Sequence, residues 1–190
     1  MKHSRRIGRV AAVLTAATVA VAMAAPIAAA PLDHGTFHDE FDFIDPDFCG
    51  AGIEVRFDVV VDGRFLVTRR GRDGLVYFME NIHRTDTVTN LANGRTITDD
   101  ERTVSKDVHV TDNGDGTLTI LVLATGNFTI FDEDGRAISR NPGQVRFELL
   151  IDNNGTPGDP SDDSELAFTV VKESTGRSDD ACEAAVPALS

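Results

Sequence analysis

The segment from Glu54 to Val61 reads EVRFDVVV, and along it apolar and charged side chains alternate. Val55, Phe57 and Val59 fall on one side of an extended chain, whereas Arg56 falls on the other. In a strand, successive side chains point to opposite faces, so a period of two predicts a strand with one buried face. This pattern, repeated along the chain, constrains the fold more than any other feature.

Short turn-forming sequences separate the alternating segments. Asp62-Gly63 is predicted to be a two-residue hairpin turn, and Asp73-Gly74, Asn93-Gly94 and Asn141-Pro142-Gly143 are predicted to be further turns. The expected strands are 54–61, 64–70, 75–89, 102–110, 118–131, 144–151 and 166–173, with one more near Phe41 and Phe43. We therefore predict an all-β fold, an antiparallel up-and-down β-barrel of about eight strands, with a β-sandwich as the alternative.

Three details of these strands can be compared with the structure. Val104, Val108 and Val110 are expected to be buried, and Gly126 is expected to mark a bulge or a bend. The segment 118–124 is apolar on both faces, which suits a strand covered on its outside. The C-terminal segment from Ser178 onwards is the only one predicted to be helical, with Ser178 as its N-cap.

The N-terminus has the three-part layout of a secretory signal peptide. Lys2, Arg5, Arg6 and Arg9 precede an apolar run from Val10 to Ala24, and small residues follow it. The run is too short for a membrane-spanning helix, which needs about twenty residues. We predict a signal peptide over residues 1–29, cleaved after Ala24 or Ala29, and a secreted, extracellular protein.

The rest of the chain is predicted to be a tail and one domain. Residues 30–47 form the N-terminal tail, in which Phe41 and Phe43 could belong to an edge strand, and residues 48–190 form a single β domain. Cys49 and Cys182 are the two cysteines of an exported chain, which predicts a disulfide between the two ends of this domain.

The charge balance excludes some classes of partner. Of 18 Lys and Arg residues, four lie in the predicted signal peptide, whereas all 31 Asp and Glu residues follow it, so 14 minus 31 leaves a charge of −17. Such a charge repels phosphate backbones and anionic lipids. We therefore expect neither a nucleic acid nor a membrane surface as partner.

Motifs of catalysis and of metal binding are absent from the sequence. It has no G-x-S-x-G, no P-loop and no H-E-x-x-H spacing, so no catalytic residue and no cofactor are predicted. In the strand 75–89, one side carries mixed apolar and polar residues, which suits a pocket for a small ligand. The candidate pocket residues are Tyr77, Met79, Asn81 and His83, with Glu80 from the opposite side.

An acidic loop follows Ile151 and contains Asn, Gly, Pro, Asp and Ser in a turn-rich order. Pro157 stands where an EF-hand has its glycine, so an EF-hand is excluded. A looser calcium site remains as an alternative, formed by Asp152, Asp159, Asp162 and Asp163. The favoured interpretation is a solvated hairpin connection.

The signal peptide, DFCGAGIEV, TDNGDGT, DNNGTPGDPSDD and the late Cys182 together resemble small secreted proteins of high-GC Gram-positive bacteria. The resemblance implies export, a β fold and a terminal disulfide, and it carries no catalytic residues. The leading hypothesis is a non-enzymatic secreted domain that could bind a small apolar molecule. The alternatives are a barrel-type isomerase or cyclase using Glu80, Asn81 and His83, and a structural or adhesive extracellular protein.

Overall fold

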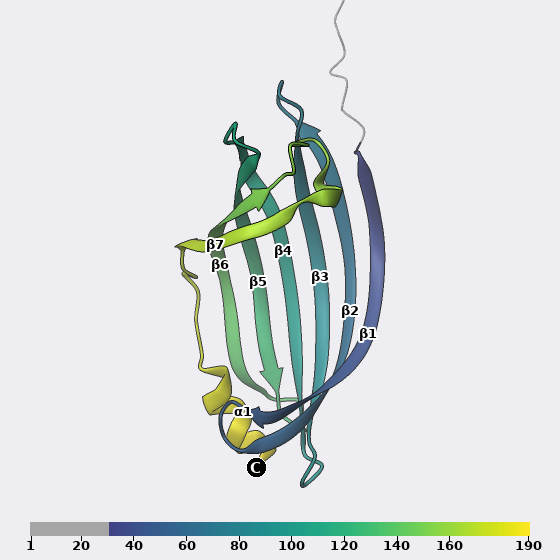
Figure 1. The fold of residues 1–190 in the computed structure, drawn as a ribbon. Coiled ribbons are helices and arrows are strands. Elements are labelled where there is room, and N and C mark those ends of the chain that lie inside the picture. Colours follow the sequence, from purple (N-terminus) through teal and green to yellow (C-terminus); the bar gives the residue numbers. More distant parts are fainter. Residues whose placement is uncertain (1–30) are drawn as a thin grey trace, which may run out of the picture.

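The computed structural model describes residues 31–190, so the predicted signal peptide and its two cleavage positions lie outside the described residues. Seven strands form one antiparallel sheet in sequence order, each paired with the next (Figure 1). A 3₁₀ turn, η1, and one helix, α1, complete the fold. The bounds are β1 Asp33–Phe48, β2 Ile53–Arg70, β3 Leu75–Asn90, β4 Thr96–Asp112, β5 Thr117–Phe131, β6 Ala137–Asp152, η1 Pro160–Asp162, β7 Ser164–Lys172 and α1 Ala181–Leu189.

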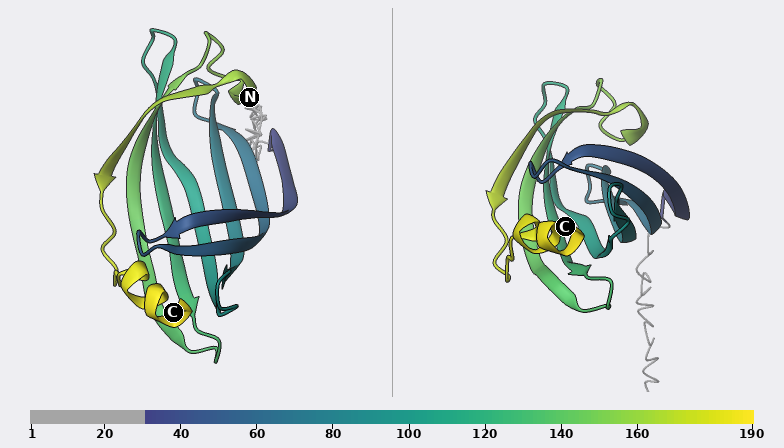
Figure 2. Two further views of the ribbon diagram at one scale, coloured as in Figure 1. Left: turned by 60° about the horizontal axis from the view of Figure 1, so that its bottom comes forward. Right: turned by 90° about the horizontal axis from the view of Figure 1, so that it is seen from below.

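The all-β antiparallel prediction is confirmed, but the sheet does not close into a barrel. The strands β1 and β7 are its two edges and do not pair with each other. The sheet is strongly curved, so that its β1–β2 part folds over the concave side of the remaining strands (Figure 2). The predicted sandwich alternative fits this arrangement, with both layers supplied by one continuous sheet.

There is one strand fewer than expected because Asp62-Gly63 is not a turn. Both residues lie inside β2, and the register of β2 with β1 and with β3 runs unbroken past them. Gly63 faces the ring of Phe37, and a Cβ at this position would overlap that ring. The glycine therefore serves close aromatic packing in the middle of a strand, and not the positive φ of a hairpin.

The N-terminal segment is more regular than expected, because β1 spans 16 residues and pairs with β2 along most of its length. Most of the predicted tail is thus an edge strand, and it includes Phe41 and Phe43. A bulge between Asp45 and Phe48 ends the regular pairing, just before the turn at Cys49. The alternation in this segment is partly hidden by its many acids, which occupy both faces.

Glycines form a row across the middle of the sheet. Gly63, Gly126 and Gly143 belong to one cross-strand row, completed by Ile82 and Thr103. No bulge occurs at Gly126, where a Cβ would lie 2.6 Å from the carbonyl oxygen of Arg102. Glycine kinks in such a row let a sheet bend sharply, which accounts for the curvature.

The predicted turn at Asn141-Pro142-Gly143 is also part of a strand, β6. Strand β7 pairs only with residues 146–152 of β6, so the first half of β6 is an edge. Proline is tolerated at an edge because it has no N–H to leave unpaired. The segment after β7 packs here instead: a Cβ on Gly143 would overlap the hydroxyl of Ser174.

A bulge in β4 overturns part of the burial prediction. The register with β5 shifts between Asp107 and His109, which leaves Val108 as the extra residue. Val110 therefore lies on the opposite face from Val104. Val110 is buried, whereas Val104 and Val108 are exposed.

The tightest packing lies at the end of the sheet that α1 covers. Ala185 and Leu189 of α1 contact Val55, Val88 and Ile97, and all five are almost fully buried. The helix begins two residues later than expected, with Asp180 as N-cap, whose carboxylate accepts a hydrogen bond from the N–H of Glu183. The apolar outer face of β5 is thus not covered by the helix, which packs inside the curve of the sheet.

The predicted disulfide is present. Cys49 lies in the turn between β1 and β2, and Cys182 lies in the first turn of α1, with their Cα atoms 5.6 Å apart. The bond therefore fixes the helix to the first hairpin. In the part of the chain that the structure describes, no helix is long and apolar enough to cross a membrane.

A second, smaller core lies at the other end, where Val110, Leu118 and Ile151 are buried together. The acidic loop 153–163 lies next to it, and Pro157 and Pro160 approach Leu118. The loop is anchored by Asn153, which is buried, and by Arg69, whose guanidinium donates to the carbonyl of Gly158 at 3.0 Å. The acidic loop is thus folded over one end of the sheet, and does not project freely as a hairpin tip.

Candidate functional site

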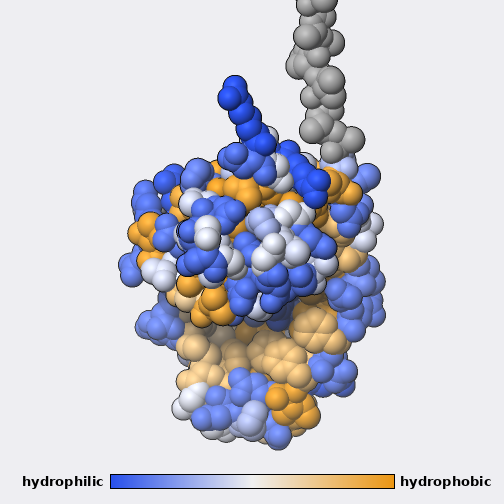
Figure 3. Space-filling view, turned by 45° about the horizontal axis from the view of Figure 1, so that its top comes forward, coloured by the Kyte–Doolittle hydropathy of each residue, from blue (hydrophilic) through white to orange (hydrophobic). Residues whose placement is uncertain are grey.

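Between its two small cores, the concave face of the sheet is hollow. Figure 3 shows a recess with apolar residues along it, below the band formed by β7 and the acidic loop. The aromatic side chains here are only partly covered: Phe41, Phe43 and Phe78 each keep about two fifths or more of their surface exposed. Aromatic groups left uncovered inside a curved sheet mark a binding surface more often than a packing defect.

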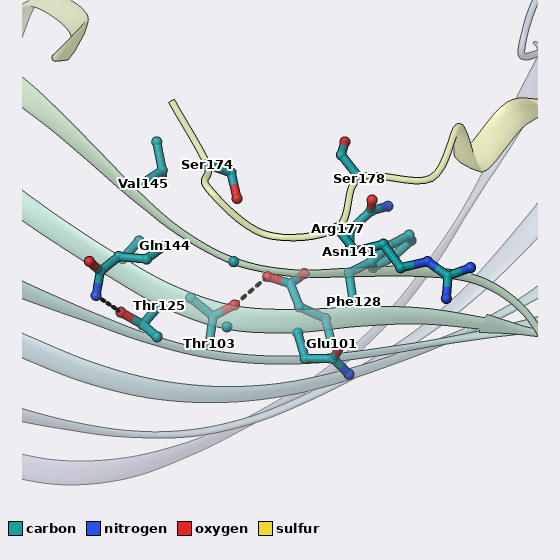
Figure 4. A pocket seen from close by; sticks show the side chains of 14 residues that line it. Glu101, Thr103, Thr125, Phe128, Asn141, Gln144, Val145, Ser174, Arg177 and Ser178 are labelled. Carbon is teal, nitrogen blue, oxygen red and sulfur yellow. Dashed lines mark hydrogen bonds between the residues drawn. The ribbon is translucent and has the colours of Figure 1, made fainter. Parts of the chain in front are cut away.

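Two adjoining cavities lie on this face. One has a volume of about 320 Å³ and lies between strands β4–β6 and the segment 174–178, which crosses above them (Figure 4). The other, of about 210 Å³, is lined by Arg84, Asp86, Asp99, Glu101 and Phe128. The two cavities share Glu101 and Phe128 as lining residues and therefore adjoin, and together we call them the Glu101 cavity.

The sheet register explains why charged groups meet in the Glu101 cavity. Asp86 lies directly opposite Asp99, and Arg84 lies directly opposite Glu101, all on the concave side of β3 and β4. Arg84 holds Asp86 through two hydrogen bonds, Nε–Oδ1 of 2.7 Å and Nη2–Oδ2 of 2.6 Å. One guanidinium therefore faces three carboxyls, so the cluster carries a charge of −2 when all of them are ionised.

Asp99 is the most perturbed carboxyl of the cluster. Desolvation by burial, followed by repulsion from Asp86, raises its pKa to about 7, and Arg84 only partly offsets this. Asp99 Oδ1 is buried and has no hydrogen-bond partner. A carboxyl that titrates near neutrality in a cavity can bind a cation when ionised, or exchange a proton with a bound molecule.

Further unpaired polar atoms lie on the same face. Ser139 is only 1% exposed, and its hydroxyl has no partner. It belongs to the cross-strand row of Asp86, Asp99 and Ile130. The side-chain oxygen of Asn141, which lines the larger cavity, is also buried and unpaired. Buried polar atoms without partners are uncommon and point to a missing ligand or water.

The acidic strip extends beyond the cluster towards the acidic loop. Glu80 lies on the concave side of β3, and burial raises the pKa of its carboxyl. Asp107 lies on the concave side of β4 and accepts a hydrogen bond of 2.7 Å from the N–H of Phe78. Burial raises the pKa of Asp107 more than this hydrogen bond lowers it.

The sequence-predicted pocket residues are divided between the two faces of β3. Glu80 faces the concave side, whereas Met79, Asn81 and His83 alternate with it and face the convex side. His83 Nε2 lies 2.7 Å from Asp100 Oδ2. Asn81 and His83 line a separate depression of about 330 Å³ on that side, together with Ile82, Arg102, Thr103 and Val104.

Tyr77 has a different role, at the point where β3 and β4 stop pairing. Its hydroxyl accepts a hydrogen bond of 3.3 Å from the N–H of Val110, and its ring packs against the second core. The guanidinium of Arg70 lies 4.8 Å from the centre of the ring. The structure therefore does not bring the five predicted pocket residues into one site.

Three of the four acids of the predicted calcium alternative accept hydrogen bonds within the acidic loop itself, whereas Asp163 Oδ1 is buried without a hydrogen-bond partner. Asp159 accepts hydrogen bonds from the N–H and the hydroxyl of Ser161, and Asp162 accepts one from the hydroxyl of Thr156. Asp152 accepts one from the N–H of Asn154. Burial and the neighbouring acids raise the pKa of Asp163. Within residues 31–190, no three His, Cys, Asp or Glu side chains are grouped so that they could hold a metal ion.

Sequence reasoning missed Asp86, Asp99 and Glu101, although a signal for them exists. Asp99 and Glu101 keep the alternation of Ile97, so they fall on the buried face of their strand. An alternation with a period of two places these acids on the interior face of the strand. Burying an acid costs free energy, so acids at such positions indicate a functional site. The valines that follow predict the opposite face as the buried one, and the bulge in β4 makes that prediction wrong.

Comparisons with known proteins add no assignment. No protein-family model, no curated protein and no solved structure matches the chain.

Proposed function

We propose that this protein is a secreted, non-catalytic binding domain that takes a small, largely apolar molecule into the Glu101 cavity. The observation that carries the proposal is the open, partly aromatic recess with a few polar groups at its base. Ligand sites have this composition, because apolar walls supply affinity and a few polar groups fix the orientation. The disulfide supports an extracellular location, since such bonds persist in oxidising compartments.

A neutral fluorescent probe tests the proposal. N-phenyl-1-naphthylamine gains fluorescence in apolar sites, and we expect it to bind the folded protein with micromolar affinity. Ala124→Trp places a large ring on the concave floor of the cavity, which Ala124 lines, and should weaken binding at least tenfold. The natural chain has no tryptophan, so the new indole also reports on its own surroundings.

Leu123→Trp is the matched control. Leu123 is the neighbour of Ala124 in β5 and lies on the other face, opposite Lys106 and Arg146. The control should bind the probe as the natural chain does. If the natural chain does not bind the probe, or if both variants bind it equally well, the proposal fails.

Proton-transfer catalysis is a second candidate, favoured by the buried Asp99 with its pKa of about 7. A group poised near neutrality can remove a proton from a bound molecule and return it at another position, as an isomerase or a cyclase does. Once a ligand is known, mixing it with the protein in D₂O would show exchange of a carbon-bound hydrogen. Absence of exchange, or exchange that persists in Asp99→Asn, would eliminate this candidate.

A further inference from the structure

The concave face is divided into strips of different chemistry, and this division indicates the class of ligand. Strands β1 and β2 contribute mainly aromatic and branched side chains, and the rings of Phe43 and Phe57 stack with their centres 4.6 Å apart. Strands β5 and β6 contribute a second apolar strip, which contains Val122, Phe128, Val145 and Phe147. The strip between them, on β3 and β4, is acidic.

The charges of this middle strip do not balance. Between residues 80–86 of β3 and 99–107 of β4, the concave side carries one base, Arg84, and five acids: Glu80, Asp86, Asp99, Glu101 and Asp107. Arg84 is already committed to Asp86 through two hydrogen bonds. Asp99 Oδ1 and the hydroxyl of Ser139, which is buried on the same row, have no partners.

We propose that the ligand of the Glu101 cavity is an amphipathic cation, an apolar chain or ring system that carries an amine or a quaternary ammonium group. Its positive group would lie against Asp99 and Glu101, and its apolar part along the aromatic strip of β1 and β2. This inference depends on the proposed function, because it specifies the chemistry of the molecule bound in the same cavity. Ammonium groups are also attracted to aromatic faces, so both strips favour such a ligand over an anion.

The other charged groups around Asp99 do not neutralise it. Asp86 and Arg84 face it from β3, and Glu101 lies on its own strand. The residues of β5 and β6 in the same rows, Phe128, Ile130, Ser139 and Asn141, are uncharged. Arg177 lines the larger cavity, but Asp179 pairs with it at 2.7 Å, so the segment 174–178 does not neutralise the acids.

Isothermal titration with three probes of equal chain length tests the inference. Decyltrimethylammonium is a permanent cation, decyl sulfate a permanent anion, and decanol is neutral. At pH 8 and 0.15 M salt, we expect the cation to bind at least tenfold more tightly than decanol, and decyl sulfate to bind more weakly than both. Because its charge does not change with pH, the cation should bind several-fold more weakly at pH 5, where Asp99 is protonated.

Variants separate the cavity from general surface charge. Asp99→Asn and Glu101→Gln are nearly isosteric, and each should weaken binding of the cation about tenfold and so reduce its advantage over decanol. Asp100→Asn removes the same charge from the next position of β4, on the convex face beside His83, and should have no effect. Circular dichroism confirms that each variant is folded, and the two interior variants test the site independently.

The outcomes distinguish this inference from the proposed function. If Ala124→Trp weakens the binding of decanol, but the cation binds the natural chain no more tightly than decanol does, the cation inference is wrong and the apolar site stands. Equal losses in Asp99→Asn and Asp100→Asn also overturn the inference, because they reveal surface attraction only. If no probe binds, both proposals fail.

Discussion

Asp99 and Asp86 lie directly opposite each other in an antiparallel ladder, where like charges destabilise the pair. Asp86 accepts two hydrogen bonds from the guanidinium of Arg84. The second carboxyl has no such partner, and its pKa of about 7 reflects both its burial and the charge across the ladder. A residue that costs the fold stability at neutral pH, and is not needed for packing, is expected at a functional site.

Asp99→Asn should therefore stabilise the fold at alkaline pH. Between its ordinary pKa of 3.8 and about 7, the folded chain holds a proton that the unfolded chain has released, so the free energy of unfolding falls as pH rises through this window. At about 1.4 kcal/mol per pKa unit, the cost is at most about 4 kcal/mol at pH 8. Urea unfolding of the natural chain and of Asp99→Asn at pH 4 and pH 8 measures this cost. The variant should have the higher free energy of unfolding at pH 8, and the difference should vanish at pH 4.

The chain also depends on a residue without a side chain, Gly176. A Cβ there would overlap the backbone carbonyl of Pro142, which cannot move aside as a flexible side chain could. We expect Gly176→Ala to displace the segment 174–178 from β6 and to cost about 1–3 kcal/mol. Limited proteolysis should show faster cleavage near residue 175. Gly158→Ala is the control, since its Cβ would make only an ordinary contact; equal proteolysis of the two variants would contradict the packing argument.

Among the elements, α1 depends most on a single bond. The helix has only nine residues and contains Pro187, so it would not be stable alone, and the disulfide fixes it to the β1–β2 turn across a sequence separation of 133. Replacing both cysteines by serine should lower the free energy of unfolding by about 2–5 kcal/mol. Denaturant unfolding with and without reductant measures this. A natural chain that unfolds identically in both conditions would show that packing, and not the disulfide, holds the helix.

At the scale of the elements, the alternation of apolar and polar residues predicted the strands well, whereas glycines predicted the turns poorly. Strands such as β3 and β5 were predicted almost to the residue, because their period of two is determined by burial on one side. The turns predicted at Gly63 and Gly143 were wrong, because a glycine is equally typical of a turn with positive φ and of the close approach of another group. Which of these applies depends on Phe37 and Ser174, which lie far away in sequence and pack there only in the folded chain.

The candidate site was less predictable than the fold for a related reason. Its position depends on which face of β4 is concave, and the extra residue at Val108 reverses that assignment along the strand. The cavity also needs the segment 174–178 as its outer wall. Tight turns are encoded locally, whereas this wall forms through contacts between β6 and the last residues of the chain.

At the scale of the whole molecule, the sheet has two free edges, and the net negative charge opposes their pairing with other molecules. Strand β7 is exposed along its whole length, with Leu166, Phe168 and Val170 about half uncovered, and β1 exposes Phe41 and Ile44. Free edges with apolar side chains promote strand pairing between molecules, and a high net charge opposes it. The full sequence has a pI of about 4.6, and removal of the four basic residues of the predicted signal peptide lowers it further, so we expect a monomer at pH 8 and reversible association at or below pH 4.6. Light scattering across this range measures the association; a size that is constant with pH would contradict the role assigned to charge.

The wall of the cavity and the disulfide belong to the same stretch of chain, since the segment 174–178 ends four residues before Cys182. Breaking the bond releases α1, and with it one anchor of that wall. Any molecule that contacts the wall will then bind the oxidised protein more tightly than the reduced one. Because such coupling is reciprocal, the bound molecule must in turn make the disulfide harder to reduce by the same factor. The reduction potential of Cys49–Cys182 is therefore a measure of occupancy, and a shift on adding a compound would identify a ligand without any assay of function.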